Sequence, residues 1–253
     1  MSNTFQLLRS NELNTTTQIV VDAVNTSTVN NIIDRDTRTK WATIGYGSNT
    51  ATIFSVEFAT ATSIDRIFLQ NHNLKKFRIF YDSSTSNTFS PAIAETTNSQ
   101  SANYYEIATQ TVNSIQLQVD QAMTADTEKQ IGELYLGGLL LLFEQNPSAG
   151  NYTPQVDREQ VVHKMPNGGV AIFNVADKFQ AQLKMKHISA TFEASLRNIY
   201  DTGTTFLFVP FGTISSWDGF AYDVAWTGKY DFKFSTNSPS AGYSGTILLE
   251  ETA

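Results

Sequence analysis

The sequence predicts an all-β protein. Five stretches alternate apolar and polar residues with a period of two and are rich in β-branched and aromatic side chains, as half-buried antiparallel strands are. Clusters of Asn, Ser, Thr and Gly separate them and predict loops. The five predicted strands are residues 50–58, 65–70, 75–82, 114–120 and 180–195.

Two shorter segments predict other local structure. In residues 195–203, Leu196, Ile199 and Tyr200 recur at helical spacing, and Gly203 supplies a stop signal, so we expect a short helix. The sequence PNGG at residues 166–169 favours a hairpin turn rather than a nucleotide-binding loop.

The chain is long enough for two β domains, each with a core of its own. Residues 144–155 contain two prolines, a glycine and few apolar side chains, which is typical of a linker. We therefore predict one β-sandwich domain over residues 1–143, a linker over 144–155 and a second domain, a β-sandwich or barrel with one short helix, over 156–253. Its candidate core residues are Phe173, Phe179, Phe192, Phe206, Phe208, Phe211, Trp217, Phe220, Tyr222, Trp226, Phe232 and Phe234.

Composition excludes several classes of function. A formal charge of -7 and only 16% charged residues argue against direct nucleic-acid recognition, which rests on clustered Lys and Arg. The absence of cysteine excludes disulfides, thiolate metal sites and cysteine nucleophiles. Residues 136–143 form the longest apolar run, too short for a membrane span, and residues 1–13 lack a signal-peptide pattern. We expect a soluble protein made in a cytoplasm.

The sequence also argues against catalysis. The three histidines lack the spacing of metal motifs, and no nucleophile elbow or phosphate-binding glycine loop is present. The carboxylate pairs Asp34 with Asp36 and Glu250 with Glu251 could serve a glycosidase, but they lie in a turn and a tail. We therefore predict that the protein is not an enzyme.

The order of elements in residues 26–138 resembles the discoidin-like, galactose-binding-like jelly roll. An aspartate turn leads to a tryptophan, strands follow, and a strand with the sequence IGELYLGG ends the segment. This resemblance implies a β-sandwich. The residues that occupy matching places are Asp34, Thr39, Trp41, Val56, Phe58, Ile67, Phe77, Ile79, Tyr81, Ile131, Glu133 and Leu136.

We expect no cofactor other than the structural calcium ion that the resemblance raises as an alternative, since many members of that family hold calcium in the aspartate turn. The resemblance carries the role of ligand to Asp34 or Asp36, to Thr39 and to Glu133. Arg35 stands where family members usually have glycine, so its guanidinium could replace the cation by pairing with a carboxylate. Both alternatives stay open.

Sugar-binding relatives in that family display aromatic and basic residues on loops at one end of the sandwich. Candidates for glycan binding here are Tyr46, His72 and Phe89, which form no recognisable constellation. Trp41 could stack on a sugar, but its place after the aspartate turn favours the core.

The second half resembles the tail-tube-like domain of phage tail-end proteins. The resemblance rests on strand order and on the closing aromatic sequence WDGFAYDVAWTGKYDF, residues 217–232. It implies a homo-oligomer, a hexameric ring that extends the tail tube, built by heterologous contacts between subunits. We also expect the alternating strand from Gln180 to Phe192, if it stands at an edge, to be covered by a neighbouring subunit.

The leading hypothesis is a structural virion protein of a phage tail tip, of distal tail or baseplate type, with the sandwich on its periphery. Its partners would be other phage tail and baseplate proteins. The alternative is a carbohydrate-binding adhesin or receptor-binding module that recognises host-surface glycans.

Overall fold

The computed structural model describes residues 4–21, 26–35, 39–43, 50–84, 88–148, 150–165, 168–210, 221–236 and 241–252. These residues form strands in three sheets, one α-helix and two short 3-10 helices, and every strand pair whose register is resolved is antiparallel. The predicted all-β class with one short helix is confirmed. The chain divides into two compact units, chiefly Leu8–Leu140 and chiefly Leu141–Phe211 with Ala221–Ala253.

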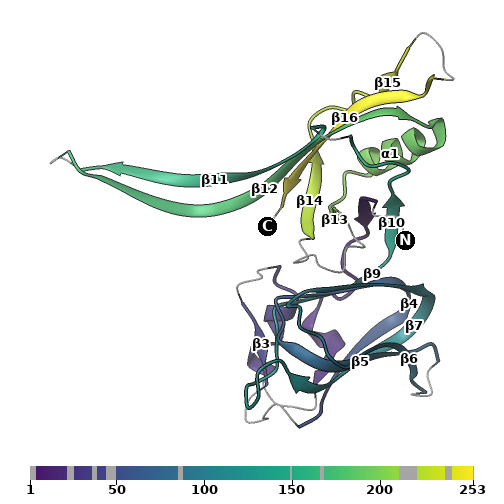
Figure 1. The fold of residues 1–253 in the computed structure, drawn as a ribbon, viewed down its shortest axis with the longest axis vertical. Helices are drawn as coiled ribbons and strands as arrows, with labels where there is room; N and C mark the ends of the chain where they lie inside the picture. Colours follow the sequence, from purple (N-terminus) through teal and green to yellow (C-terminus); the bar gives the residue numbers. More distant parts are fainter. Residues whose placement is uncertain are drawn as a thin grey trace. The chain divides into compact units, whose positions relative to one another are not determined.

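The first unit is a β-sandwich (Figure 1). Its main sheet has the order β2-β4-β7-β5-β6, with β9 also paired to β4, while β3 and β8 form a separate pair. The element bounds are η1 Thr16–Gln18, β2 Ile19–Val21, η2 Thr26–Ile32, β3 Trp41–Ala42, β4 Thr52–Gln70, β5 Leu74–Asp82, β6 Ser90–Glu95, β7 Asn103–Ala122, β8 Gln130–Ile131 and β9 Glu133–Gly137.

The two long strands β4 and β7 organise this sandwich. They pair over residues 52–57 with 114–119 and again over 62–69 with 103–112, with one register shift between the two blocks and another between Ile64 and Arg66. Such irregularities bend a strand, so one strand can serve both sides of a core. Strand β5 pairs with β7 beside the first block, and β9 pairs with β4 beside the second.

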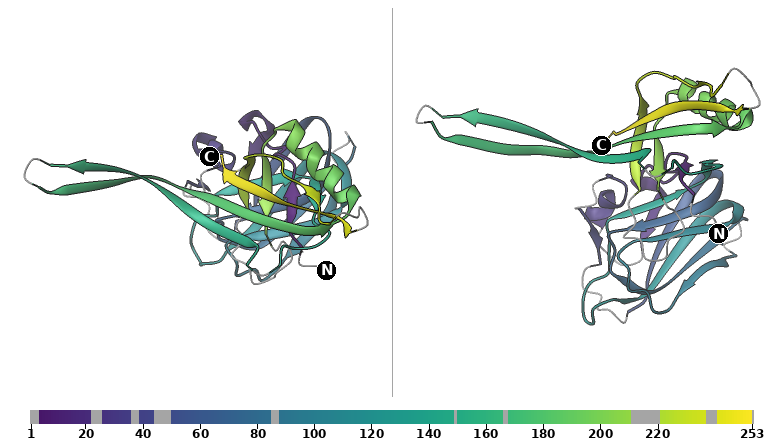
Figure 2. Two further views of the ribbon diagram at one scale, coloured as in Figure 1. Left: turned by 90° about the horizontal axis from the view of Figure 1, so that it is seen from above. Right: turned by 45° about the horizontal axis from the view of Figure 1, so that its top comes forward.

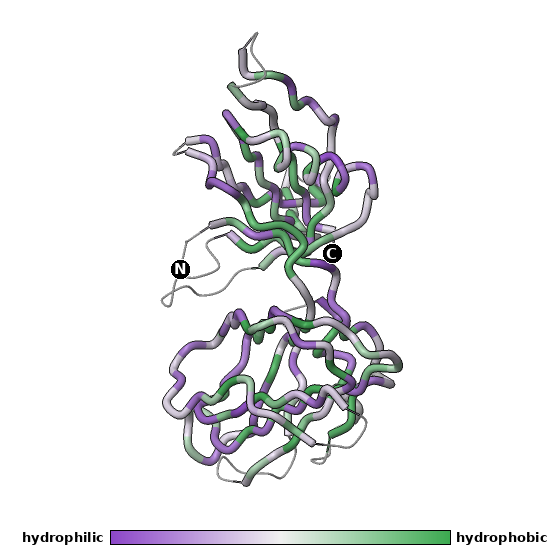
Figure 3. The backbone as a smooth tube through the Cα atoms, turned by 90° about the vertical axis from the view of Figure 1, so that its right-hand side faces the viewer, coloured by the Kyte–Doolittle hydropathy of each residue, from purple (hydrophilic) through white to green (hydrophobic). Residues whose placement is uncertain are grey.

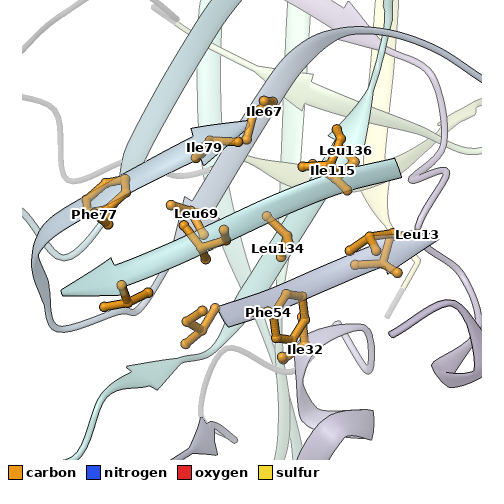
Figure 4. Packing of buried hydrophobic residues seen from close by; sticks show 14 of the residues in the cluster. Leu13, Ile32, Phe54, Ile67, Leu69, Phe77, Ile79, Ile115, Leu134 and Leu136 are labelled. Atoms are coloured by element: carbon orange, nitrogen blue, oxygen red, sulfur yellow. The ribbon is translucent and has the colours of Figure 1, made fainter. Parts of the chain in front are cut away.

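Alternate side chains of these strands point inward and fill one apolar core (Figure 4). A cavity of about 10 Å³, lined by residues such as Phe54, Ile115 and Leu134, lies among them, so packing is close. Trp41 is fully buried and meets the Phe54 ring edge-on at 5.6 Å between centroids. The prediction that Trp41 belongs to the core is confirmed.

The second unit is built on a sheet with the order β10-β1-β13-β14-β16-β12-β11, to which β15 adds through β16. Strand β1 and the core residues Phe5, Leu7 and Phe143 thus belong to this unit, although the predicted boundary assigned residues 1–143 to the first domain. The element bounds are β1 Gln6–Leu8, β10 Leu139–Leu142, β11 Tyr152–Lys164, β12 Val170–Ile188, α1 Ala190–Thr202, β13 Phe206–Val209, β14 Tyr222–Thr227, β15 Lys233–Phe234 and β16 Tyr243–Glu251.

Helix α1 confirms the predicted helix but begins earlier. Ser189 caps it by accepting the Phe192 N–H at 3.0 Å, and Gly203 ends it in the left-handed conformation at φ 59°. The predicted strand over 180–195 is therefore wrong beyond Ile188. Phe192 reaches the core from the helix rather than from an edge strand.

The condition that this strand stands at an edge is not met over residues 180–183, where β12 lies between β11 and β16; from Lys184 on its register partner is β16. Over residues 170–179 β12 pairs with β11 alone. We call residues 158–164 and 170–177 the arm; this two-stranded ribbon projects from the sheet of its unit (Figures 1 and 2). Where the hairpin turn was predicted, the Gly168 N–H donates to the Met165 carbonyl at 3.0 Å and Gly168 has φ 83°; Pro166 and Asn167 lie outside the described residues.

Two residues predicted to lie in the core, Phe173 and Phe234, are exposed instead. Phe173 on the arm is 57% exposed, and Phe234 on β15 is 49% exposed although its ring contacts Tyr243 of β16 at 4.8 Å between centroids. Phe179, Phe192, Phe206, Phe208 and Phe232 are buried as predicted, while Tyr222 and Trp226 pack partly buried against them. Phe211, Trp217 and Phe220 lie outside the described residues. Apolar and polar residues alternate along both units (Figure 3).

Candidate functional site

The aspartate turn between η2 and β3 is a closed corner of the first unit. The Thr39 hydroxyl donates to Asp34 Oδ2 at 2.7 Å, and the Asn31 side-chain amide donates to the Lys40 carbonyl at 3.0 Å. These bonds tie the two ends of the corner together. Asp36 lies outside the described residues.

Glu133, the first residue of β9, brings a second carboxyl group to this corner. The pKa of Glu133 is raised from 4.5 to about 9, first by burial and then by a side-chain hydrogen bond with Asp34 and by the charge of Asp34. A hydrogen bond with the Arg35 backbone and the Arg35 charge act in the opposite direction. Glu133 Oε1 is buried and has no hydrogen-bond partner among the described residues.

Gly132 explains how β9 approaches the corner so closely. A Cβ at this position would lie 2.9 Å from Asn71 Cβ and 3.4 Å from the Thr39 carbonyl oxygen. A larger residue would push Glu133 away from Asp34. The corner therefore depends on a glycine that the sequence places one residue before the carboxylate.

The residues present fit a hard cation. Two carboxyl groups side by side in a partly buried site must share a proton or a positive ion, and a buried Glu133 Oε1 without a partner is a vacant oxygen ligand. Asp34, Thr39 and Glu133 would hold such an ion. Within the described part of the chain, no group of three or more His, Cys, Asp or Glu side chains gathers as a metal cluster.

Arg35 adopts φ 62°, the left-handed conformation that glycine takes without strain. This gives a physical reason for the glycine expected at this place in the family. The main chain of Arg35 bonds to Glu133. Arg35 therefore acts on the carboxyl pair through its backbone as well as its charge.

The structure separates the predicted glycan residues. His72 is only 3% exposed; its Nε2 lies 2.8 Å from Asn103 Oδ1, and its Nδ1 accepts the Leu74 N–H at 3.1 Å. Burial lowers the pKa of His72 to about 4, against the Asn103 hydrogen bond, which raises it, so the imidazole stays neutral near pH 7. Phe89 is half-buried just before β6, and Tyr46 lies outside the described residues.

A polar cluster on the outer face of β5 and β7 was not predicted. Asp120 accepts from Gln118 at 3.1 Å and lies 3.4 Å from Arg78 and 3.9 Å from Lys76. The Arg78 guanidinium also stands 5.9 Å from the centre of the half-buried Phe80 ring. The alternation in residues 75–82 could have placed Arg78 and Phe80 on one outward face.

The acid pair Glu250 and Glu251, considered for catalysis, does not converge; Asp36 of the other pair lies outside the described residues. Glu251 Oε2 accepts the Phe179 N–H at 2.7 Å and so closes the sheet, while Glu250 lies opposite Gln180 in the ladder between β12 and β16. Neighbouring residues of a strand point to opposite faces. These two carboxylates therefore cannot flank one bond.

No protein-family model matches the chain, and no curated protein matches it. Solved structures match about half of it. Chitosan-binding module 1 from a chitosanase/glucanase of Paenibacillus sp. IK-5 is 12% identical over 51% of this chain and 100% of its own, with a TM-score of 0.44. Chitosan-binding module 2 of the same enzyme, in complex with chitotriose, is 16% identical. The match covers 47% of this chain and 95% of that module, with a TM-score of 0.42.

Module CBM32-5 from Clostridium perfringens, in complex with GalNAc-β-1,3-galactose, is 11% identical over 47% of this chain and 94% of its own, with a TM-score of 0.41. Likenesses of this size carry no conclusion about function. Separately, none of the helices in the described ranges is long and apolar enough to cross a membrane.

Proposed function

We propose that this chain is a non-catalytic structural protein whose second unit binds other copies of the chain through the arm. The observation that carries the proposal is the row of exposed apolar side chains along the hairpin that bears the arm. These are Val156, Val161, Val162, Met165, Val170, Ile172 and Phe173, each between 43% and 66% exposed. Monomeric proteins seldom leave a contiguous apolar surface of this kind in water.

The finer form of this proposal is a ring at a phage tail tip. It rests on the resemblance of residues 156–253 to tail-tube-like domains. In that setting the second unit forms a hexameric ring, the first unit lies on its periphery, and the protein resides in the virion beside other tail and baseplate proteins. Ring-forming contacts are heterologous, and a projecting ribbon suits them.

Multi-angle light scattering of the full chain, over a wide range of concentrations, tests self-association. We expect the mass to rise to a fixed multiple of 28.1 kDa and negative-stain images to show closed rings. A mass of one chain at every concentration would contradict the proposal. A discrete oligomer without a ring would contradict only the tail-tip form.

A second candidate is carbohydrate recognition by the first unit, favoured by the cluster on β5 and β7. Phe80 lies opposite Gln116 in the ladder, and Arg78 lies opposite Gln118, so an aromatic ring and hydrogen-bonding groups share one outward face. Sugars are bound by such combinations of an apolar ring with oriented donors and acceptors. Host-surface glycans would be the natural ligands of a tail-tip protein.

A glycan array with the full chain tests this candidate, with chitotriose and GalNAc-β-1,3-galactose among the probes. We expect a hit to be lost in Phe80→Ala and in Gln118→Ala and retained in Thr60→Ala, an exposed control on β4. A hit that survives both cluster variants would place glycan binding elsewhere. An array without any hit would argue against this candidate.

We propose in addition that a calcium ion held by Asp34, Thr39 and Glu133 stabilises the first unit. The buried, unpartnered oxygen of Glu133 supports this role. The ion would replace the proton that the carboxyl pair otherwise shares, and its effect would be on stability rather than on chemistry.

A further inference from the structure

We infer that the arm is buried on both of its faces, by two other copies of this chain, one copy on each face. This inference rests on the proposed self-association and adds its geometry. Each arm would then lie between two neighbouring copies, as a wedge, and would contact both of them rather than one.

The register of the arm divides its apolar side chains between the two faces. Val161 lies opposite Phe173, and the adjacent pair, Val162 opposite Ile172, points the other way, because successive residues of a strand alternate. Val170, opposite Lys164, shares the face of Ile172. Phe173 and Ile172 are each 57% exposed, so neither face is covered within the chain.

Docking on one surface would leave half of these side chains in water. A half-buried strand normally reads apolar on one face and polar on the other, with the polar face toward solvent. The outer part of the arm carries apolar side chains on both faces, beside His163 on one and Lys164 on the other, so its apolar residues are not confined to one face as in a half-buried strand. Its base is polar, since Arg158 donates to Asp177 at 2.8 Å and both side chains are about half exposed. The wedge is therefore the outer part of the arm.

Charge favours another copy of this chain as the partner. The hairpin over residues 152–188 contains five Lys and Arg and three Asp and Glu, so its formal charge is +2. The chain carries -7 in total, which leaves -9 on the remaining residues. The arm itself is neutral, so the excess positive charge lies at the base of the hairpin, on Lys178, Lys184 and Lys186. Attraction to the negative remainder of a neighbour therefore acts at the base, and salt will weaken it.

Each copy also has an edge strand with exposed apolar side chains on the same sheet. Strand β10 ends the sheet on the edge opposite β11, and its Leu140 and Leu142 are 37% and 43% exposed. An apolar edge strand without a partner is a hazard unless it is covered. A projecting arm at one end of the sheet and an apolar edge at the other allow a heterologous contact that repeats from copy to copy.

Two neighbouring residues provide a matched test. Ile172→Lys and Phe173→Lys each place one charge at a position of equal exposure, on opposite faces of the arm. Gln155→Lys, an exposed position at the base of the hairpin, is the control. Light scattering of the full chain against concentration measures association, and thermal unfolding checks that each variant keeps its fold.

We expect Ile172→Lys and Phe173→Lys each to weaken association by roughly tenfold or more, with Gln155→Lys close to wild type. Association lost in only one of the two variants would overturn burial on both faces and leave the proposed self-association intact. Association unchanged in both would remove the arm from the contact altogether. A wild-type chain that is monomeric throughout would instead refute the proposed function itself.

Discussion

The two units differ in how much of their apolar surface is buried within the chain. In the first unit most apolar side chains gather in one closed core, with Val20 exposed, and polar groups such as His72 and Glu133 are buried or partly buried beside that core. The second unit has a closed core as well, yet it leaves a row of apolar side chains outside on the arm. Burial inside one chain serves stability, whereas apolar surface left outside is available to a partner. We therefore look for assembly on the arm and for ligands on the polar features of the first unit.

The same substitution in the two places should give the largest contrast. Phe54→Ala removes a ring that is 1% exposed in the first core, and we expect it to lower the free energy of unfolding by about 3 to 5 kcal/mol. Phe173→Ala removes a ring that is 57% exposed, and unfolding should change by no more than about 0.5 kcal/mol. Urea denaturation followed by circular dichroism, at concentrations too low for association, measures both.

Association should respond in the opposite order. Phe173→Ala should weaken self-association, while Phe54→Ala should leave it unchanged wherever the protein stays folded. A Phe173→Ala variant that loses stability as a monomer would show that the arm folds back on its own chain. That outcome would erase the contrast between the two units.

Much of this architecture could be predicted from the sequence because the signals are local. Alternation marked the strands, helical spacing with Gly203 marked α1, and PNGG marked the hairpin turn. The end of β12 at Ile188 was missed, because the alternation of apolar and polar residues continues past Ser189. Only the capping hydrogen bond of Ser189 shows that a helix begins there. Alternation also assigns a face without saying whether another element covers it, so Phe173 was placed in the core although it lies outside.

The site was less predictable, because its partners are far apart in the chain. Asp34 and Glu133 were paired by resemblance to a family, and no periodicity in the sequence links two residues so distant. The interior position of His72 depends on Asn103 of another strand and on the backbone of Leu74. A single histidine in a polar loop sequence gives no sign of either contact.

Calcium should raise the stability of the first unit and leave the arm unaffected. At a calcium concentration about 100 times the dissociation constant, the gain in unfolding free energy is about 2.7 kcal/mol. We expect calcium to raise the melting temperature of wild type, EDTA to reverse the shift, and Glu133→Gln to abolish it. An equal shift in Glu133→Gln would exclude Glu133 as a ligand.

The carboxyl pair also predicts a pH dependence in the absence of calcium. The folded state holds a proton on Glu133 up to a pKa of about 9, whereas the ordinary value is 4.5, so stability should fall as pH rises between these values. Glu133→Gln should flatten this slope. The stabilisation by calcium should instead grow with pH, because the ion and the proton compete for the same oxygens.

His72 predicts a pH effect of opposite sign. Its pKa is lowered from 6.5 to about 4 in the folded state, so stability present above pH 6.5 should be lost as pH falls through this window. We expect a loss on the order of 3 kcal/mol, measured by urea denaturation at a series of pH values. His72→Gln should remove this dependence, and the exposed His163→Gln should retain it. If the unfolding free energy changes with pH equally in both variants, the pKa of His72 is not lowered in the folded state.

The smallest effect should come from the cap of helix α1, which belongs to the closed part of the second unit. Ser189→Ala removes the acceptor of the Phe192 N–H and a hydroxyl that donates to Glu144 Oε2 at 2.7 Å, and should destabilise the unit by about 1 kcal/mol. Ser189→Thr keeps the cap and should stay within a few tenths of wild type. Since the helix lies against the core and not on the arm, neither variant should alter self-association at fixed concentration. A Ser189→Ala chain that dissociates while still folded would show that assembly depends on the helix, and the arm would no longer suffice to explain it.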